Sequence, residues 1–161
     1  MSRKTSLQRK TKETDIKIEL NIDGKGKTDI KTPIPFLSHL LDNFTKHGLF
    51  DLKIRAEGDI EIDQHHTVED IGISLGETFK KALGDKKGIN RAGYFVFPLD
   101  EALSVVALDI SGRAFLNFNC KFKKEKIGDL DSDLIKEFFW GFVRHLEATL
   151  HIRALSGEND H

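Results

Sequence analysis

Several features that would restrict the fold or location of a protein are scarce in this sequence. Only one cysteine occurs among 161 residues, which excludes an internal disulfide and fits a reducing compartment. No run of about 18 apolar residues is present, and no apolar signal-peptide core follows Met1. Neither charge sign dominates, because the formal net charge is −1. We therefore expect a cytoplasmic protein that binds neither membrane nor nucleic acid.

The residues that are abundant predict a packed, water-soluble domain. Hydrophobic residues make up 39% of the chain, with 12 Phe, and charged residues make up 32%. The lysine-rich segment 2–12 predicts a solvated arm at the start of the chain. The single cysteine, Cys120, shares its strand face with Leu116, Phe118 and Phe122, which indicates a buried structural thiol and not a nucleophile.

Hydrophobic periodicity predicts alternating strands and helices. Residues 14–22 alternate apolar and polar side chains at the period of a strand. Residues 36–48 and 67–85 carry apolar side chains at helical spacing, and residues 50–62 between them predict a pair of strands. The coarse pattern is therefore that of a mixed α+β protein.

The second predicted helix carries two unusual features. Gly72 and Gly76 are unfavourable inside a helix and indicate that another backbone packs closely there. Thr67 and Asp70 have the spacing of a capping box, with Asp in place of the usual Glu. We expect Asp70 either to cap this helix or to orient a nearby histidine.

The two halves of the chain resemble each other in sequence. Residues 39–56 align with 137–154 at an offset of 98, and both segments end in Ile-Arg-Ala. Residues 12–25 align with 100–113 at an offset of 88, so the second half carries an insertion around 121–133. Two matches in the same order favour a tandem duplication.

The duplication predicts the domain organisation. A βββαβα unit with an N-terminal arm would occupy residues 1–88, and a second copy would occupy residues 89–161. We expect the two units to pack as one compact two-layer α/β domain. The second copy lacks its last helix, so we expect the chain to be truncated.

A His-His-x-x-Glu sequence lies at the start of the second predicted helix. His65 and His66 diverge by about 100° on a helix, so they would point toward two neighbouring sites. Glu69 returns to the face of one of them, and imidazole with carboxylate suits Mn, Fe or Zn. Surface histidines beside acids at a helix start are the alternative. The similar stretch that ends in His161 favours metal binding.

Other histidines and acids have weaker signals. Periodicity alone places His39 and Glu137 on solvated helix faces, but their equivalent positions in the two repeats make them candidate third ligands. His47 and His145 lie near predicted helix C-termini, where a contact with the helix dipole explains them as well as function does. His151 lies in a strand and is interpreted as structural.

Two arginines could bind an anion. Arg91 and Arg113 both follow glycine-containing turns, and the guanidinium fork suits phosphate. Ordinary surface roles are the alternative. Phosphate-loop, Rossmann and nucleophile-elbow patterns do not occur in the sequence.

Taken together, seven segments resemble the imidazoleglycerol-phosphate dehydratase family of histidine biosynthesis. They follow one another in order along nearly the whole chain, which is far more specific than any single motif. The segments are RKTKETDI, PFLSHLLDNFTKHGLFDL, IDQHHTVEDIGISLG, KKGINRAG, PLDEAL, DISGRAFLNFN and LHIRALSGENDH.

The resemblance implies a fold, a reaction and a site. The fold would be a duplicated unit like the second domain of ribosomal protein S5. The reaction would be dehydration of D-erythro-imidazole-glycerol phosphate to imidazole-acetol phosphate at a two-manganese site shared between subunits. The implied metal ligands are His39, His65, His66, Glu69, Glu137 and His161, with His66 and Glu69 also catalytic. The implied substrate contacts are Glu13, Asn43, His47, Arg91 and Arg113.

The resemblance also implies a homo-oligomer, a 24-mer for a full-length metal-bound form and a trimer for a truncated or metal-free form. Because part of the second metal motif is missing, we expect this chain to be inactive or impaired. Two alternatives stay open. One is a metal-dependent hydrolase that uses a single His-His-x-x-Glu, and the other is a non-catalytic trimeric core.

Overall fold

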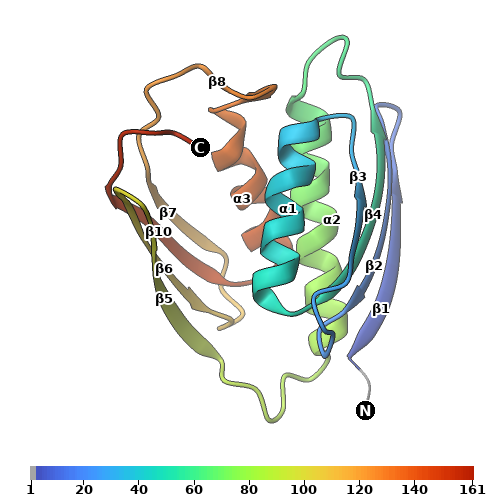
Figure 1. Cartoon of the computed structure of the whole chain (residues 1–161). Helices are drawn as coiled ribbons and strands as arrows, with labels where there is room; N and C mark the ends of the chain where they lie inside the picture. Colours follow the sequence, from blue (N-terminus) through green and yellow to red (C-terminus); the bar gives the residue numbers. More distant parts are fainter. Residues whose placement is uncertain (1–2) are drawn as a thin grey trace.

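A computed structural model describes residues 3–161 as three helices enclosed by two four-stranded sheets (Figure 1). The first sheet has the order β1-β2-β4-β3, in which β3 and β4 are parallel and the other pairs antiparallel. Its unit consists of β1 (Lys4–Lys10), β2 (Thr14–Asn21), β3 (Thr28–Lys31), α1 (Pro35–Gly48), β4 (Asp51–Gly58) and α2 (His65–Leu83).

The second sheet repeats this arrangement with the order β5-β6-β10-β7, in which β7 and β10 are the parallel pair. The insertion forms a short hairpin of two strands. The elements of this unit are β5 (Ala92–Leu99), β6 (Ala102–Asp109), β7 (Phe115–Asn119), β8 (Lys126–Ile127), β9 (Leu130–Asp131), α3 (Leu134–Leu146) and β10 (Thr149–Ser156).

The matching strand orders confirm the duplication. α1 and β4 correspond to α3 and β10, as the alignment of residues 39–56 with 137–154 predicts. The expected boundary after residue 88 lies in the connection between α2 and β5. Within residues 3–161, the second unit has no helix equivalent to α2.

Two local predictions are wrong. The lysine-rich segment is no solvated arm, because Lys4–Lys10 pairs with β2 along its whole length and forms an edge strand of the first sheet. Residues 50–62 form one strand and not two. β4 ends at Gly58, and the chain then turns, with Ile62 N–H donating to Asp59 O at 2.9 Å.

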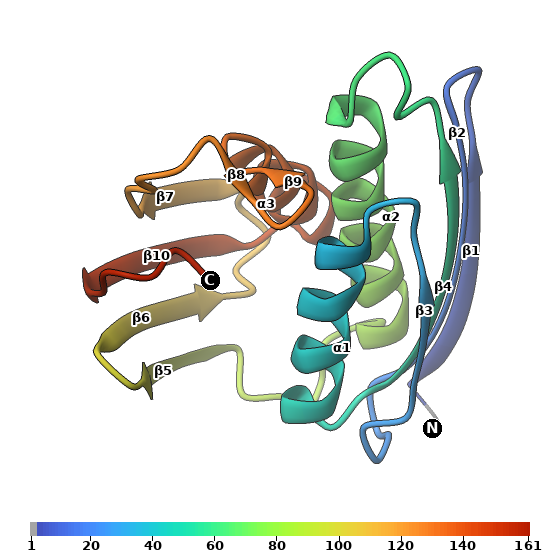
Figure 2. The ribbon, with the colours of Figure 1, turned by 45° about the horizontal axis from the view of Figure 1, so that its top comes forward.

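The main core lies between the first sheet and the helices (Figure 2). Ile16, Ile18 and Ile54 are each at most 1% exposed. Alternation at period two brings these side chains to the face of β2 and β4 that α2 covers. A smaller core in the second unit includes Leu150 and the half-buried Cys120, whose thiol pKa is raised by burial.

The two helix glycines have the predicted role. A Cβ atom on Gly72 would lie 2.3 Å from the carbonyl oxygen of Phe138, and one on Gly76 would lie 2.3 Å from that of Phe142. α2 and α3 therefore cross with their backbones in close contact, which fixes the start of α2 relative to the start of α3. No helix within residues 3–161 combines the length and the apolar character needed to cross a membrane.

Candidate functional site

All three helices begin at the same end of the molecule, which we call the helix-start end (Figure 1). It consists of the first two turns of α1, α2 and α3, together with residues 157–161. Unpaired N–H groups and the helix dipoles make this end favourable for carboxylates. The structure brings every predicted metal ligand to it: His39, His65, His66, Glu69, Glu137 and His161.

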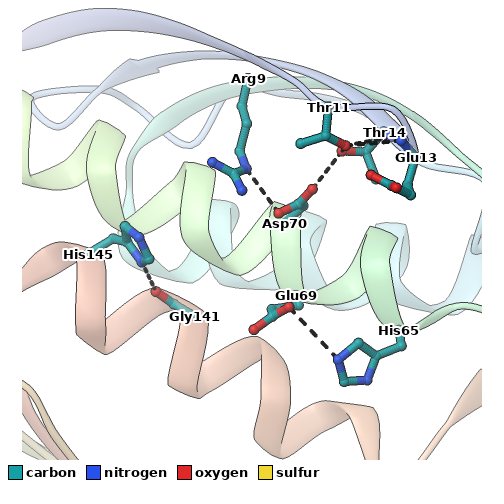
Figure 3. A network of polar contacts seen from close by, with 9 residues as sticks. All are labelled: Arg9, Thr11, Glu13, Thr14, His65, Glu69, Asp70, Gly141 and His145. Atoms are coloured by element: carbon teal, nitrogen blue, oxygen red, sulfur yellow. Dashed lines mark hydrogen bonds and ion pairs between the residues drawn. The ribbon is translucent and has the colours of Figure 1, made fainter.

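The first turn of α2 pairs a histidine with a carboxylate. His65 Nε2 lies 3.8 Å from Glu69 Oε2, with the side chains 44% and 36% exposed (Figure 3). Their i,i+4 spacing places both on one face of the helix. The turn before the helix is ordered by Asp63 Oδ1, which accepts the N–H of His65 at 2.6 Å. This pair presents an imidazole nitrogen and a carboxylate oxygen to solvent.

His66 points elsewhere, as divergence of adjacent helix residues predicts. Its Nδ1 lies 3.3 Å from Asp59 Oδ2, in the turn that follows β4. A carboxylate on Nδ1 holds the proton on that nitrogen and leaves Nε2 with a free lone pair. Asp59 was missed by the sequence reasoning, and only its place next to the turn could have suggested it.

His39 and His161 approach each other from distant parts of the sequence. Their ring centroids are 5.5 Å apart, and the ring of Phe36 packs edge-on against His161 at 5.3 Å. Asn43 Nδ2 lies 3.2 Å from His39 Nε2, so the predicted substrate contact Asn43 adjoins a predicted ligand. Glu101 Oε1 accepts the N–H groups of residues 158 and 159 and so anchors the segment that carries His161.

Asp70 has neither of the roles that its spacing suggested. α2 begins at His65, and its N-cap residue Gln64 makes no side-chain capping hydrogen bond. Asp70 instead accepts hydrogen bonds from Arg9 and Thr14, on the side of α2 that faces the first sheet (Figure 3). Thr67 does not cap the helix either, because its hydroxyl is buried without a partner among the described residues.

The predicted phosphate ligands lie at the opposite end of the molecule. Arg113 O accepts from Thr149 Oγ1 at 3.3 Å, just beyond the C-terminus of α3. At a rise of 1.5 Å per residue, the C-terminus of α3 lies roughly 15 Å along the helix axis from Glu137. Arg91 precedes β5 and pairs with Asp109, Nε to Oδ1 at 2.8 Å. His47 lies in the last turn of α1, and its ring contacts Phe97.

The two remaining histidines have local contacts. His145 Nδ1 lies 2.9 Å from Gly141 O, one turn earlier in α3 (Figure 3). The ring of His151 lies near that of Phe115 in a tilted arrangement, with the centroids 5.8 Å apart. Neither lies at the helix-start end.

One chain therefore holds four of its six potential ligands as two pairs. Within residues 3–161, no three His, Cys, Asp or Glu side chains come close enough together to hold a metal ion. The pairs are His65 with Glu69 and His39 with His161, and His66 is oriented separately by Asp59. Completing a metal site would need a further donor or a rotation of these exposed side chains.

Comparison with known proteins gives a consistent result along the whole chain. The family model for imidazoleglycerol-phosphate dehydratase matches residues 32–161. The imidazoleglycerol-phosphate dehydratase of Citrifermentans bemidjiense is 57% identical over 161 residues, which are all of this chain and 83% of that protein. The relative of the same name from Hydrogenovibrio crunogenus is 55% identical over 159 residues, 99% of this chain and 82% of that protein.

Solved structures agree with the fold. The imidazoleglycerol-phosphate dehydratase of Staphylococcus aureus superposes with a TM-score of 0.83 at 38% identity, covering 96% of this chain and 86% of that one. The IGPD of Pyrococcus furiosus, solved in complex with (S)-C348, gives a TM-score of 0.82 at 40% identity, covering 95% of this chain and 81% of that one. The shared sequence, the duplicated fold and the histidine-carboxylate pairs agree, and the chain belongs to the imidazoleglycerol-phosphate dehydratase family.

Proposed function

We propose that this chain carries out the dehydration of D-erythro-imidazole-glycerol phosphate to imidazole-acetol phosphate, a step of histidine biosynthesis. The observation that carries the proposal is the His65–Glu69 pair beside an oriented His66, at a helix start in a chain 57% identical to a named dehydratase. In this proposal the protein acts in the cytoplasm, where its single cysteine stays reduced.

The donor set fits a hard or borderline divalent cation such as Mn²⁺. Imidazole and carboxylate groups suit this ion. The exposed His65–Glu69 pair keeps its lone pairs available, whereas His39 Nε2 accepts from Asn43 and would exchange that contact for a metal ion. The carboxylate of Asp59 on His66 is the arrangement that metal-ligating histidines usually have. Bound cations would supply Lewis-acid polarisation of the substrate. The residues that would hold two such ions are His39, His65, His66, Glu69, Glu137 and His161.

Residues of the chain itself would transfer protons and contact the substrate. Dehydration expels the hydroxyl group from the carbon attached to the imidazole ring and removes a proton from the next carbon of the chain, whose own hydroxyl becomes the ketone. The reaction therefore needs a group that accepts a proton and one that donates a proton. Glu69 is an exposed group of this kind at the helix-start end, because its second carboxylate oxygen stays free when the first holds a metal ion. His66, oriented by Asp59, lies in the same helix turn. Glu13, in the adjacent turn between β1 and β2, would contact the substrate there.

Phosphate recognition points to an active site shared between chains. Arg91, Arg113 and His47 lie at the end of the molecule opposite the helix starts, too far away to contact one small substrate bound there. Two protomers that meet end to end would bring both sets together. We therefore include in the proposal a homo-oligomer, with trimers as building units and a 24-mer as the metal-bound assembly.

Metal content and turnover test the proposal together. The chain is loaded with Mn²⁺, and bound metal, native mass and imidazole-acetol phosphate formation are measured. His65→Ala and Glu69→Gln should each lower bound Mn²⁺, whereas the matched control His151→Gln, which changes a histidine on β10, should retain it. Unchanged metal content in Glu69→Gln would refute the assigned ligand set.

The same assay addresses the expected impairment of this chain. The Citrifermentans bemidjiense relative, of which this chain spans 83%, serves as the reference enzyme. Turnover equal to that of the reference would disprove the impairment. Hydrolysis of phosphate esters without dehydration would instead favour the single-site hydrolase.

A further inference from the structure

A buried polar cluster lies on the face of α2 turned away from the His65–Glu69 pair. Asp70, only 7% exposed, accepts hydrogen bonds at both carboxylate oxygens (Figure 3). Arg9 Nε donates to Oδ1 at 2.9 Å, and Thr14 Oγ1 donates to Oδ2 at 2.6 Å. Arg9 lies on β1 and Thr14 begins β2, so one carboxylate ties the helix to both strands.

The turn between those strands is held by the same contacts. Thr11 Oγ1 accepts the N–H of Glu13 at 3.1 Å and that of Thr14 at 3.0 Å. It also lies 3.1 Å from Thr14 Oγ1. Because the Thr14 hydroxyl donates its proton to Asp70, the Thr11 hydroxyl is the donor in this contact. Each bond polarises the next one, which couples the shape of the turn to the Asp70 carboxylate.

A second contact returns from the turn to α2. Glu13 O accepts the N–H of Asp59 at 3.2 Å, and Asp59 Oδ2 lies 3.3 Å from His66 Nδ1. Glu13 is therefore linked by two paths to α2, at Asp70 and at His66. The first path runs through Thr14 to Asp70, and the second runs through Asp59 to His66.

Packing alone does not require a carboxylate at this position. Its neighbours Ile71 and Leu75 fill the core with apolar side chains that are at most 1% exposed. Burying a carboxylate is costly unless strong hydrogen bonds offset the loss of water. Here the two carboxylate oxygens of Asp70 order the polar turn that carries the exposed Glu13, and an apolar side chain at position 70 could not do so.

We propose that Asp70 is a positioning residue, which acts through Thr14 to fix the backbone that carries the Glu13 side chain relative to His66. The role of Glu13 as a substrate contact rests on the proposed function. The positioning itself is a property of the fold, so the two can fail separately.

Two conservative variants and a rescue test this role. Asp70→Asn keeps the shape but removes the charge, and Thr14→Val removes the hydroxyl, whereas Thr14→Ser restores it. Thr78→Val is the matched control, because Thr78 is a fully buried residue of α2 that bonds only to Ser74 O within its own helix. Hydrogen exchange of residues 11–14 and affinity for imidazole-acetol phosphate with Mn²⁺ are measured on the full chain.

We expect Asp70→Asn and Thr14→Val to speed amide exchange in the turn by about tenfold or more, because each removes a hydrogen bond to a charged acceptor. Affinity should fall in parallel. Thr14→Ser and Thr78→Val should leave exchange in the turn unchanged. In a Glu13→Gln background, Asp70→Asn should have no further effect on affinity, since it acts through Glu13.

The other outcomes are equally decisive. Unchanged exchange in the turn of Asp70→Asn overturns the proposal. The proposal is also overturned if Asp70→Asn speeds exchange but binds imidazole-acetol phosphate as tightly as Thr78→Val does. It is overturned as well if the affinity losses of Asp70→Asn and Glu13→Gln add fully in the double variant. In both cases Asp70 has only a structural role. If the unmodified chain binds no imidazole-acetol phosphate, the proposed function fails, and the exchange data still decide whether Asp70 holds the turn.

Discussion

The two halves of the molecule share a topology but differ in how their sheets are covered. In the first unit, α2 lies across the sheet, and β2 places Ile16 and Ile18 at most 1% exposed. In the second unit, every residue of β6, the equivalent of β2, is half-buried, and every residue of the edge strand β5 is exposed, including Phe95 at 63% and Phe97 at 45%. Strand order therefore survives where no helix covers the sheet, whereas buried side chains of the second sheet are confined to β7 and β10, beside α3. The helix layer, and not the sheet, determines which half is the stable core.

The largest expected difference concerns a pair of equivalent core residues. Ile54 on β4 is 0% exposed and Ile152 on β10 is 8% exposed, at the same position of the repeat. We expect Ile54→Ala to cost about 4 kcal/mol and Ile152→Ala about 2 kcal/mol, since a partly open site relaxes around the lost side chain. Urea unfolding followed by far-UV circular dichroism and by the fluorescence of Trp140 measures both.

Association must be separated from this effect. The unfolding is repeated at two protein concentrations, because association that covers the second sheet makes the stability concentration-dependent. Equal losses in the two variants at low concentration would show that the second sheet is as well packed as the first.

A smaller difference is expected for glycines. A Cβ atom added to Gly72 on α2 would lie 2.3 Å from the backbone oxygen of Phe138, whereas a Cβ on Gly93 in β5 would meet nothing within 4 Å. Gly72→Ala should cost about 1–3 kcal/mol, because a backbone oxygen cannot rotate away. Gly93→Ala should change stability by less than about 0.5 kcal/mol. Thermal unfolding of both variants checks this, and a neutral Gly72→Ala would contradict the close helix crossing.

Acid should affect the turn in the first unit more than its counterpart in the second. Asp51 Oδ1 accepts the N–H groups of Lys25 and Lys27 at 2.8 and 3.1 Å, which lowers the pKa of Asp51 below its ordinary value. The repeat equivalent is Thr149, whose hydroxyl donates to Arg113 O. A lowered folded-state pKa gives stability that is present above the unfolded pKa of about 3.9 and is lost as pH falls through the folded value.

We therefore expect amide exchange at residues 25 and 27 to rise, relative to its intrinsic rate, as pH falls below about 4. Asp51→Asn should remove most of this pH dependence, and Thr149→Val should not alter it. A pH profile of Asp51→Asn that matches that of the unmodified chain would show that another group controls the turn.

Sequence reasoning predicted the local parts of the site and missed the long-range ones. The His65–Glu69 pair follows from helix spacing alone, and the duplication follows from side-chain identities that recur in the same order at two offsets. The contact between Arg9 and Asp70 joins residues 61 positions apart, which no periodicity reports. The sequence of β1 resembles a solvated arm because only Leu7 among its inward-facing residues is apolar, so its alternation gives no strand signal.

The smallest expected effect separates two glutamates at equivalent repeat positions. Glu101 accepts the N–H groups of Glu158 and Asn159, and its own N–H and these two contacts lower its pKa. Glu13 is exposed and is held through its backbone. Glu101→Ala should therefore speed amide exchange at residues 158 and 159 by up to about tenfold. The thermal midpoint should shift by no more than about 1 °C, because each hydrogen bond removed is a surface contact. Glu13→Ala, the matched change, should leave those two amides untouched. If both variants loosen residues 158 and 159 alike, the two turns are coupled across the helix-start end, and the halves are less independent than their separate sheets imply.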